Sequence, residues 1–208
     1  MKSNHEHIEQ IIENTFQVLK EVYSNQKEGH NQCPSGDESR IVFPQYSNEY
    51  RGGETRLSEQ ELRFIFVEQF NKYCDNEQLK WFYSVETPTE YKYVFSERGV
   101  KNSNPDITDN EEKGQSAMID FAIHNDTLNR IALIEFKALN PNKLSFIKDF
   151  KKLNAEPIDD TYFIMYIKSS DSGTINNLKL KVKSSIGKAK FYCYDLESCD
   201  RIDVEILK

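Results

Sequence analysis

The chain contains two apolar stretches, AMIDFAIH at residues 117–124 and RIALIEFKA at residues 130–138, that carry its strongest fold signal. Each stretch is long enough for a β-strand. The residues between them, NDTLN at 125–129, are typical of a turn. The sequence therefore predicts a β-hairpin here.

Charged side chains interrupt both strands of this hairpin. Successive side chains of a strand point to opposite faces, so Glu135 and Lys137 end the face that also carries Ile131 and Leu133. On the first strand, Asp120 has apolar neighbours on both sides. Charged groups are costly to bury where a leucine would fold more easily, so these three residues are candidates for a functional site.

The turn determines which of these residues face one another. If the hairpin is symmetric about residues 127 and 128, Asp120 lies opposite Glu135 and Met118 lies opposite Lys137. Directly opposed residues have Cβ atoms about 4.5–5.5 Å apart. Two such carboxylates repel each other unless a cation lies between them or one is protonated. Their hard oxygen atoms suit Mg²⁺ or Mn²⁺.

A cation held in this way can bind a phosphate oxygen and make a water molecule more acidic. Lys137, two residues beyond Glu135 on the same face, can orient the attacking water or offset negative charge in the transition state. The pattern therefore predicts hydrolysis of a phosphodiester.

The N-terminal part of the chain predicts two helices separated by a polar segment. Apolar residues recur at a helical period over residues 4–24, and residues 25–55 form a polar stretch that predicts a long loop. Ser58 and Glu61 have the spacing of a capping box, so a second helix is expected from there to about residue 73. Glu59 lies on the flank of that helix's apolar stripe and needs a partner, although Glu59 and Glu61 can also simply complement the helix dipole.

The remaining elements complete an α/β pattern. The expected strands are two segments of residues 79–95 that are bent or joined at the Thr-Pro-Thr sequence around Pro88, and residues 162–167, 191–196 and 202–207. The expected helices are residues 146–153 and 174–186, and the latter is also compatible with a strand. The sequence predicts a mixed central sheet flanked by helices. Residues 1–55 are expected to form an extra N-terminal helix and polar loop that pack on a domain formed by residues 56–208.

Asp120 in one strand and Glu135-Phe136-Lys137 in the next resemble the bipartite signature of the PD-(D/E)XK nuclease superfamily. The order of predicted elements over residues 57–168 is similar to the common core of that family. The resemblance implies a restriction-endonuclease-like core and a Mg²⁺-dependent or Mn²⁺-dependent nuclease. It implies that Asp120, Glu135 and Lys137 are catalytic, that Asp120 and Glu135 bind the metal, and that the substrate is nucleic acid, with DNA favoured.

The same resemblance implies further site residues. In many members an acid on the first helix of the core joins the metal site, and Glu59 is the position that best fits this role. The helix at residues 146–153, with Lys148, Lys151 and Lys152, corresponds to a place where members often carry residues near the site.

The signature departs from the family pattern at one position. Ile119, and not proline, precedes Asp120. A literal Pro105-Asp106 pair also occurs, but it lies in a polar stretch and is interpreted as a turn.

The net charge of −7 is unevenly distributed. Residues 137–190 contain eleven lysines and five acids, a local balance of +6. This segment predicts either a localised basic face or an ordinary solvated surface. The four cysteines have no spacing typical of a zinc site or a disulfide framework, so they are expected to be free thiols.

Other features bear on location, partners and alternatives. The N-terminus lacks the apolar core of a secretory signal and no apolar run is long enough to cross a bilayer, so we expect a cytoplasmic protein without a membrane partner. The apolar stripe of residues 4–24 can pack on its own domain or pair two subunits, and we predict a homodimer. The alternative function is an interaction module in which the same fold does not cleave. No GxxxxGK[ST] loop is present for other phosphate chemistry.

Overall fold

The chain forms an α/β structure in the computed structural model, which describes residues 2–27, 39–47, 50, 52–94, 106–108, 114–183, 185 and 187–202. The helices are α1 (Asn4–Lys27), α2 (Glu59–Glu77), α3 (Lys143–Ala155) and α4 (Ser172–Lys183). The strands are β1 (Phe82–Val94), β2 (Asp106–Thr108), β3 (Gln115–His124), β4 (Arg130–Ala138), β5 (Thr161–Ile167), β6 (Lys190–Asp195) and β7 (Asp200–Ile202).

These strands form one seven-stranded sheet in the described part of the chain, in the order β2-β1-β3-β4-β5-β6-β7. Neighbouring strands from β2 to β4 are antiparallel, β4, β5 and β6 are parallel, and β7 is antiparallel to β6. Helices α3 and α4 make the two crossovers between the parallel strands. The predicted mixed sheet flanked by helices is confirmed.

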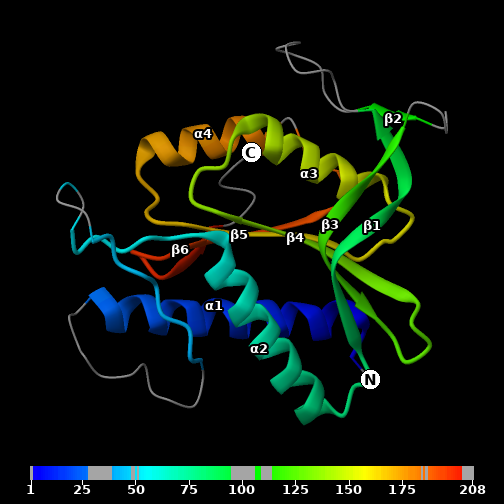
Figure 1. Cartoon of the computed structure of the whole chain (residues 1–208), viewed down its shortest axis with the longest axis horizontal. Helices are drawn as coiled ribbons and strands as arrows, with labels where there is room; N and C mark the ends of the chain where they lie inside the picture. The colour runs from blue at the N-terminus through cyan, green and yellow to red at the C-terminus, as the bar shows by residue number, and fades with distance from the viewer. Residues whose placement is uncertain are drawn as a thin grey trace.

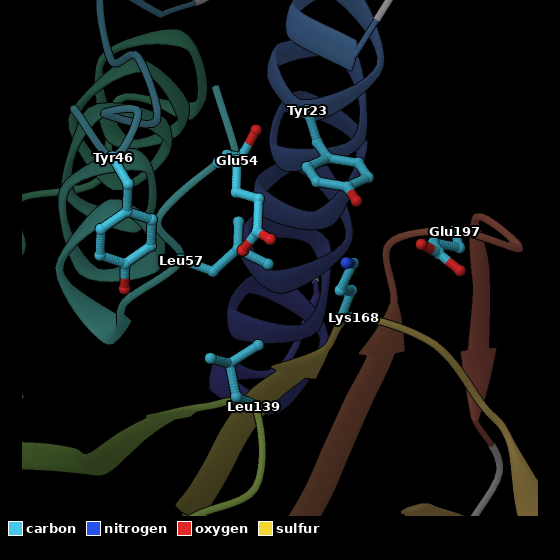
Figure 2. A pocket seen from close by; sticks show the side chains of 8 residues that line it. Tyr23, Tyr46, Glu54, Leu57, Leu139, Lys168 and Glu197 are labelled. Carbon is cyan, nitrogen blue, oxygen red and sulfur yellow. The ribbon is translucent and has the colours of Figure 1, made fainter. Parts of the chain in front are cut away.

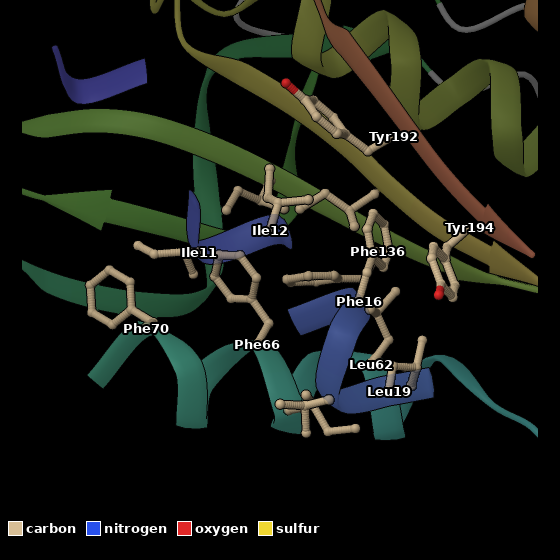
Figure 3. Close-up of a cluster of buried hydrophobic side chains, with 14 of the residues drawn as sticks. Ile11, Ile12, Phe16, Leu19, Leu62, Phe66, Phe70, Phe136, Tyr192 and Tyr194 are labelled. Carbon is tan, nitrogen blue, oxygen red and sulfur yellow. The ribbon is translucent and has the colours of Figure 1, made fainter. Parts of the chain in front are cut away.

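Helices α1 and α2 cover one face of the sheet, and α3 and α4 cover the other (Figure 1). The apolar stripe of α1 is buried with that of α2 against the sheet (Figure 3). Phe16 stacks on Tyr194 of β6 with ring centroids 5.0 Å apart, and Phe66 of α2 packs edge-on against Phe136 of β4. The N-terminal helix therefore packs on its own domain, and the stripe that motivated the homodimer prediction is buried within the chain.

The opposite face has its own apolar core, formed between α3, α4 and the sheet. Phe150 stacks on Phe163 of β5 with ring centroids 4.3 Å apart, and Val182 of α4 is fully buried. The alternation predicted for β4 is confirmed from Ala132 onward: Leu133 belongs to this core, whereas Ala132, Ile134 and Phe136 belong to the core under α1 and α2. Glu135 and Lys137, which alternate with those residues, thus face the layer of α3. Ile131, expected on the face of Leu133, packs against the core under α1 and α2 instead.

Strand β1 agrees with one of the two expected forms, a strand that is bent and not interrupted at the Thr-Pro-Thr sequence around Pro88. It is one strand with a shift in register between Pro88 and Lys92. The carboxylate of Glu156, which is fully buried after α3, accepts hydrogen bonds from the backbone N–H groups of Glu90 and Tyr91. The Glu156 side chain thus provides hydrogen-bond partners for backbone N–H groups at the irregular part of the β-ladder, and the strand continues past Pro88.

Two other expectations need correction or fall outside the structure. Asp106 does not belong to a turn, because it begins β2, which pairs with β1 at the edge of the sheet. The strand expected at 202–207 is described only as β7, Asp200–Ile202, and residues 203–208 lie outside the described residues.

Cys74, Cys193 and Cys199 are free thiols, and Cys33 lies outside the described residues. None of the helices in the described ranges is long and apolar enough to span a bilayer.

The packing of α1 predicts that it is an integral part of the fold. Replacing Phe16 with Ala should lower the free energy of unfolding by about 3–5 kcal/mol, because it opens a cavity beside Tyr194. The exposed neighbour Gln17 is the matched control, and Gln17→Ala should change stability by less than about 0.5 kcal/mol. Urea denaturation followed by circular dichroism measures both. Equal unfolding midpoints for the two variants would show that α1 is only loosely attached.

Candidate active site

Strands β3 and β4 separate at the position predicted for the site. Their ladder has the expected register from the pair Ile123–Ala132 to the pair Phe121–Ile134 and ends there, while β3 continues to pair with β1 through Ile119 and Met118. Next to the turn the register is shifted by one residue, because His124 pairs with Arg130 and not with Ile131. Beyond the ladder, the side chain of Asp120 accepts a hydrogen bond from the backbone N–H of Phe136 at 2.9 Å. Asp120 therefore lies in the fork between the two strands, and the predicted pairs Asp120–Glu135 and Met118–Lys137 do not form backbone rungs.

Glu135 is the most deeply buried member of the site, with 1% of its side chain exposed. It forms an ion pair with Lys152 of α3, which also donates a hydrogen bond to the carbonyl of Met118 at 2.7 Å. Burial raises the pKa of Glu135 well above its usual range, and the nearby carboxylates of Asp149 and Asp120 raise it further. Lys152 thus fills the fork on the side of α3.

Lys137 is held by carboxylates from both helical layers. Its ammonium group lies 2.9 Å from Asp149 of α3 and 3.9 Å from Glu59 of α2. Burial would lower the pKa of Lys137, but Asp149, Glu135 and Asp120 together raise it above the usual value. Lys137 is therefore a firmly protonated cation at neutral pH.

Glu59 and Arg63 extend the site to helix α2. Arg63 lies 2.9 Å from Asp120 and 3.9 Å from Glu59, and it also pairs with Glu86 of β1 at 3.4 Å. Desolvation by burial and the Asp120 carboxylate raise the pKa of Glu59, and together they exceed the lowering effect of Lys137. Glu59 remains 35% exposed, so solvent reaches the network from the side of α2.

The local sequence explains the position of Glu59. Ser58 precedes α2, and the Glu61 carboxylate accepts hydrogen bonds from the backbone N–H and the hydroxyl of Ser58. The hydroxyl of Tyr166 donates to the carbonyl of Ser58 at 2.7 Å. The predicted capping box is confirmed, and it assigns Glu61 a structural role while leaving Glu59 directed at Lys137.

Seven side chains therefore form one cluster, which we call the charge network: Glu59, Arg63, Asp120, Glu135, Lys137, Asp149 and Lys152. All four residues predicted for the site belong to it. The sequence patterns did not indicate Asp149 or Arg63, and they gave Lys152 no individual role. Asp149 could have been found, because it is an acid on the otherwise apolar face of α3 between Phe146 and Phe150.

The charges of the network nearly balance, with four carboxylates and three cations. Within the described residues, no group of three or more His, Cys, Asp or Glu side chains is placed so that it could hold a metal ion. Cations separate the carboxylates: Arg63 contacts Asp120, and Lys152 contacts Glu135. Both acids must be released from these partners before they can share a divalent ion.

His124 lies apart from the charge network. His124, at the end of β3, bonds to the hydroxyl of Ser84 at 2.8 Å and to the carbonyl of Leu128 at 3.2 Å, which gives it a role beside the turn. His30 lies outside the described residues. Trp81 packs against the core under α1 and α2, where its ring meets that of His7.

A pocket of about 360 Å³ adjoins the network at the carboxyl ends of β4, β5 and β6 (Figure 2). Its lining residues are Tyr23, Tyr46, Glu54, Thr55, Leu57, Leu139, Lys168 and Glu197. Leu57 and Leu139 lie close in sequence to Glu59 and Lys137, but no member of the charge network lines the pocket. The pocket is thus a neighbour of the candidate site and not its cavity.

Comparisons with protein-family models, curated proteins and solved structures find no match to this chain. The interpretation of the charge network therefore depends on the residues and geometry of the chain itself.

Removing Lys152 should reveal how strongly the buried acid depends on its cation. Lys152→Met leaves Glu135 buried without its partner, so the free energy of unfolding should fall by about 3–5 kcal/mol at neutral pH in EDTA. The loss should shrink as the pH falls, since a glutamate with a raised pKa in the folded state costs stability only when the pH exceeds its unfolded pKa.

Two further variants make this experiment specific. The double variant Lys152→Met/Glu135→Gln should recover part of the loss, because it removes the unpaired charge. Lys151→Met is the matched control, since Lys151 is a half-buried neighbour outside the network. Urea midpoints that are the same for Lys152→Met and Lys151→Met would show that the pair contributes nothing to stability.

Proposed function

We propose that this chain is a Mg²⁺-dependent or Mn²⁺-dependent nuclease of the PD-(D/E)XK type, which hydrolyses phosphodiester bonds of nucleic acid, with DNA favoured. One observation carries the proposal: Asp120, Glu135 and Lys137 meet in a single buried network where β3 and β4 separate. Buried charges of both signs at the end of an apolar strand are destabilising unless they are compensated, and they are common where chemistry is done.

The order of elements supports the same assignment. Helix α2, the antiparallel strands β1, β3 and β4, the crossover helix α3 and the parallel strand β5 follow one another as in a restriction-endonuclease-like core. Strand β2 is then an addition at the edge of the sheet, and α1 is the extra N-terminal helix. Asp120 lies in the middle strand of the antiparallel unit, and Glu135 and Lys137 lie in the next strand.

The donor atoms of the network suit a hard divalent cation. Asp120 and Glu135 offer carboxylate oxygens, and Glu59 lies on the solvent-accessible side. Burial is the main cause of the raised pKa values of Glu135 and Glu59, and neighbouring carboxylates add to it. A divalent cation beside these groups would stabilise their charged forms. When bound, such a cation would polarise a phosphate oxygen and activate water.

The chain's own residues supply positioning and charge. Lys137 is protonated, and Asp149 restrains its ammonium group, so it can offset negative charge that develops on a phosphate beside Glu135. The N–H of Phe136 fixes one oxygen of Asp120. Arg63 competes for the other oxygen and must move aside for metal binding.

A second function, a binding module of the same fold without cleavage, is favoured by one observation. Arg63 and Lys152 already pair with Asp120 and Glu135, so the network is closed without a metal ion. Lys137 itself pairs with Asp149 and Glu59 and not with the two proposed ligands. A cleavage assay decides between the two functions.

The wild-type protein should cleave DNA in Mg²⁺ or Mn²⁺ and not in EDTA. Asp120→Asn and Lys137→Ala should each reduce the rate by at least about 100-fold, because the first weakens metal binding and the second removes charge compensation. Supercoiled plasmid, linear duplex, single-stranded DNA and RNA are the substrates to compare.

Asp160→Asn is the matched control for removal of an acid that is paired with a lysine. Asp160 lies 2.7 Å from Lys190, just before β5 and outside the charge network. This variant should cut within about twofold of wild type. If wild type fails to cut every substrate in both metals, the binding-module function replaces the nuclease.

Metal binding should also be visible without turnover. Mn²⁺ should raise the melting temperature of the wild type, and Asp120→Asn should gain less, because one ligand charge is lost. Asparagine keeps an oxygen that can accept the N–H of Phe136, so this variant should still fold. Lys137→Ala keeps both ligands and should retain the rise. A rise in Asp120→Asn as large as that of wild type contradicts the assignment of Asp120 as a ligand.

A further inference from the structure

The two helical layers of this protein carry opposite charge. Helices α1 and α2 together contain nine acids against four lysines and arginines, a balance of −5. Helices α3 and α4 together contain seven lysines against one acid, a balance of +6. Among the four helices, positive charge is therefore concentrated on one face of the sheet.

Five of the seven lysines on α3 and α4 lie on the outer side of this layer, and we call them the lysine face: Lys143, Lys148, Lys151, Lys179 and Lys183. Lys143 and Lys183 are exposed, and the other three are half-buried. The one acid of these helices, Asp149, is itself buried and paired with Lys137 and Lys152. Asp149 therefore belongs to the interior of this layer and not to its outer side.

Helix α4, which carries part of the lysine face, also contacts the loop that leaves the candidate site. The ammonium group of Lys181 on α4 donates hydrogen bonds to Asn140 and Pro141, in the loop that leads from β4 to α3. That loop begins directly after the strand that carries Lys137, and Lys143 starts the helix that follows it. The buried side of α4 thus braces the loop that leaves the site, while Lys179 and Lys183 belong to its outer side.

Charge and position together select one kind of partner. A polyanion gains electrostatic attraction on the layer of α3 and α4 and meets repulsion on the layer of α1 and α2. Glu135 and Lys137 face the layer of α3, so a phosphate chain held there lies on the same side of the sheet as these two residues. Lysines on neighbouring helices, without an aromatic platform among them, suit contact with phosphates more than with bases.

We propose that the lysine face binds the phosphate backbone of nucleic acid and guides it toward the charge network. The proposal rests on the proposed nuclease function for the identity of the polyanion. The contact is independent of base sequence, because lysine ammonium groups that meet phosphate oxygens carry no information about bases.

The experiment measures binding without cleavage. A fluorescently labelled DNA duplex of mixed sequence is titrated with full-length protein in EDTA, and anisotropy is followed over a series of salt concentrations. The test variant is the double charge reversal Lys179→Glu/Lys183→Glu. The matched control is Lys20→Glu/Lys72→Glu on α1 and α2, which changes the net charge by the same amount on the acidic layer.

Wild type should bind with an affinity that falls steeply with salt. The α4 reversal should weaken binding by at least about tenfold at low salt and reduce the slope of log affinity against log salt by about 2. The control reversal should change affinity by less than about twofold. Circular dichroism confirms that both variants are folded; if the α4 reversal is not, Lys179→Gln/Lys183→Gln replaces it, with a smaller loss in the same direction.

Several outcomes would overturn the proposal. The first is that the wild-type protein does not bind DNA at low salt. The second is that the two charge reversals weaken DNA binding equally. The third is that the wild type binds anionic phosphatidylserine vesicles as tightly as DNA and that the α4 reversal loses this vesicle binding. The cleavage assay separates this proposal from the nuclease function. If the lysine face binds DNA but nothing is cut, the nuclease assignment fails and the binding face stands. If the α4 reversal cuts and binds like wild type, the binding face fails and the nuclease stands.

Discussion

The ion pair between Glu135 and Lys152 is the interaction on which the rest of the candidate site depends. A carboxylate buried in an apolar layer is strongly unfavourable without a counter-charge, and Lys152 supplies one from α3. The same ammonium group donates to the carbonyl of Met118, on the strand that turns away from β4. The Lys152 ammonium group thus compensates the charge of a buried carboxylate and donates a hydrogen bond to a backbone carbonyl where β3 and β4 separate.

The two helical layers have different tasks around this fork. Helices α1 and α2 supply the larger apolar core, and the first turn of α2 also carries Glu59 toward Lys137. Helix α3 packs its phenylalanines on the other face and places Asp149 beside the same lysine. Lys137 is therefore held between the layers, and its position depends on the packing of both.

Much of this arrangement could be predicted from residue patterns. The alternation in RIALIEFKA gave the correct faces for Glu135 and Lys137. Symmetric pairing about the turn at 125–129 gave the correct register for residues 121–123 with 132–134, but not for His124 beside the turn. The fork could not be predicted, because it depends on β3 following β1 while Asp120 takes the N–H of Phe136 through its side chain. Arg63 was missed for a similar reason: it lies one turn after Glu59, and only the packing of α2 brings it to Asp120.

The uneven charge of the helical layers has a consequence for how the molecule moves in solution. Helical layers of −5 and +6 on opposite faces of one sheet contribute an electric dipole component that runs across the sheet. In the field of a distant polyanion, such a dipole experiences a torque that turns α3 and α4 toward the source before any contact is made. At low ionic strength, where this field extends over tens of ångströms, many encounters begin in one orientation, and added salt removes that bias.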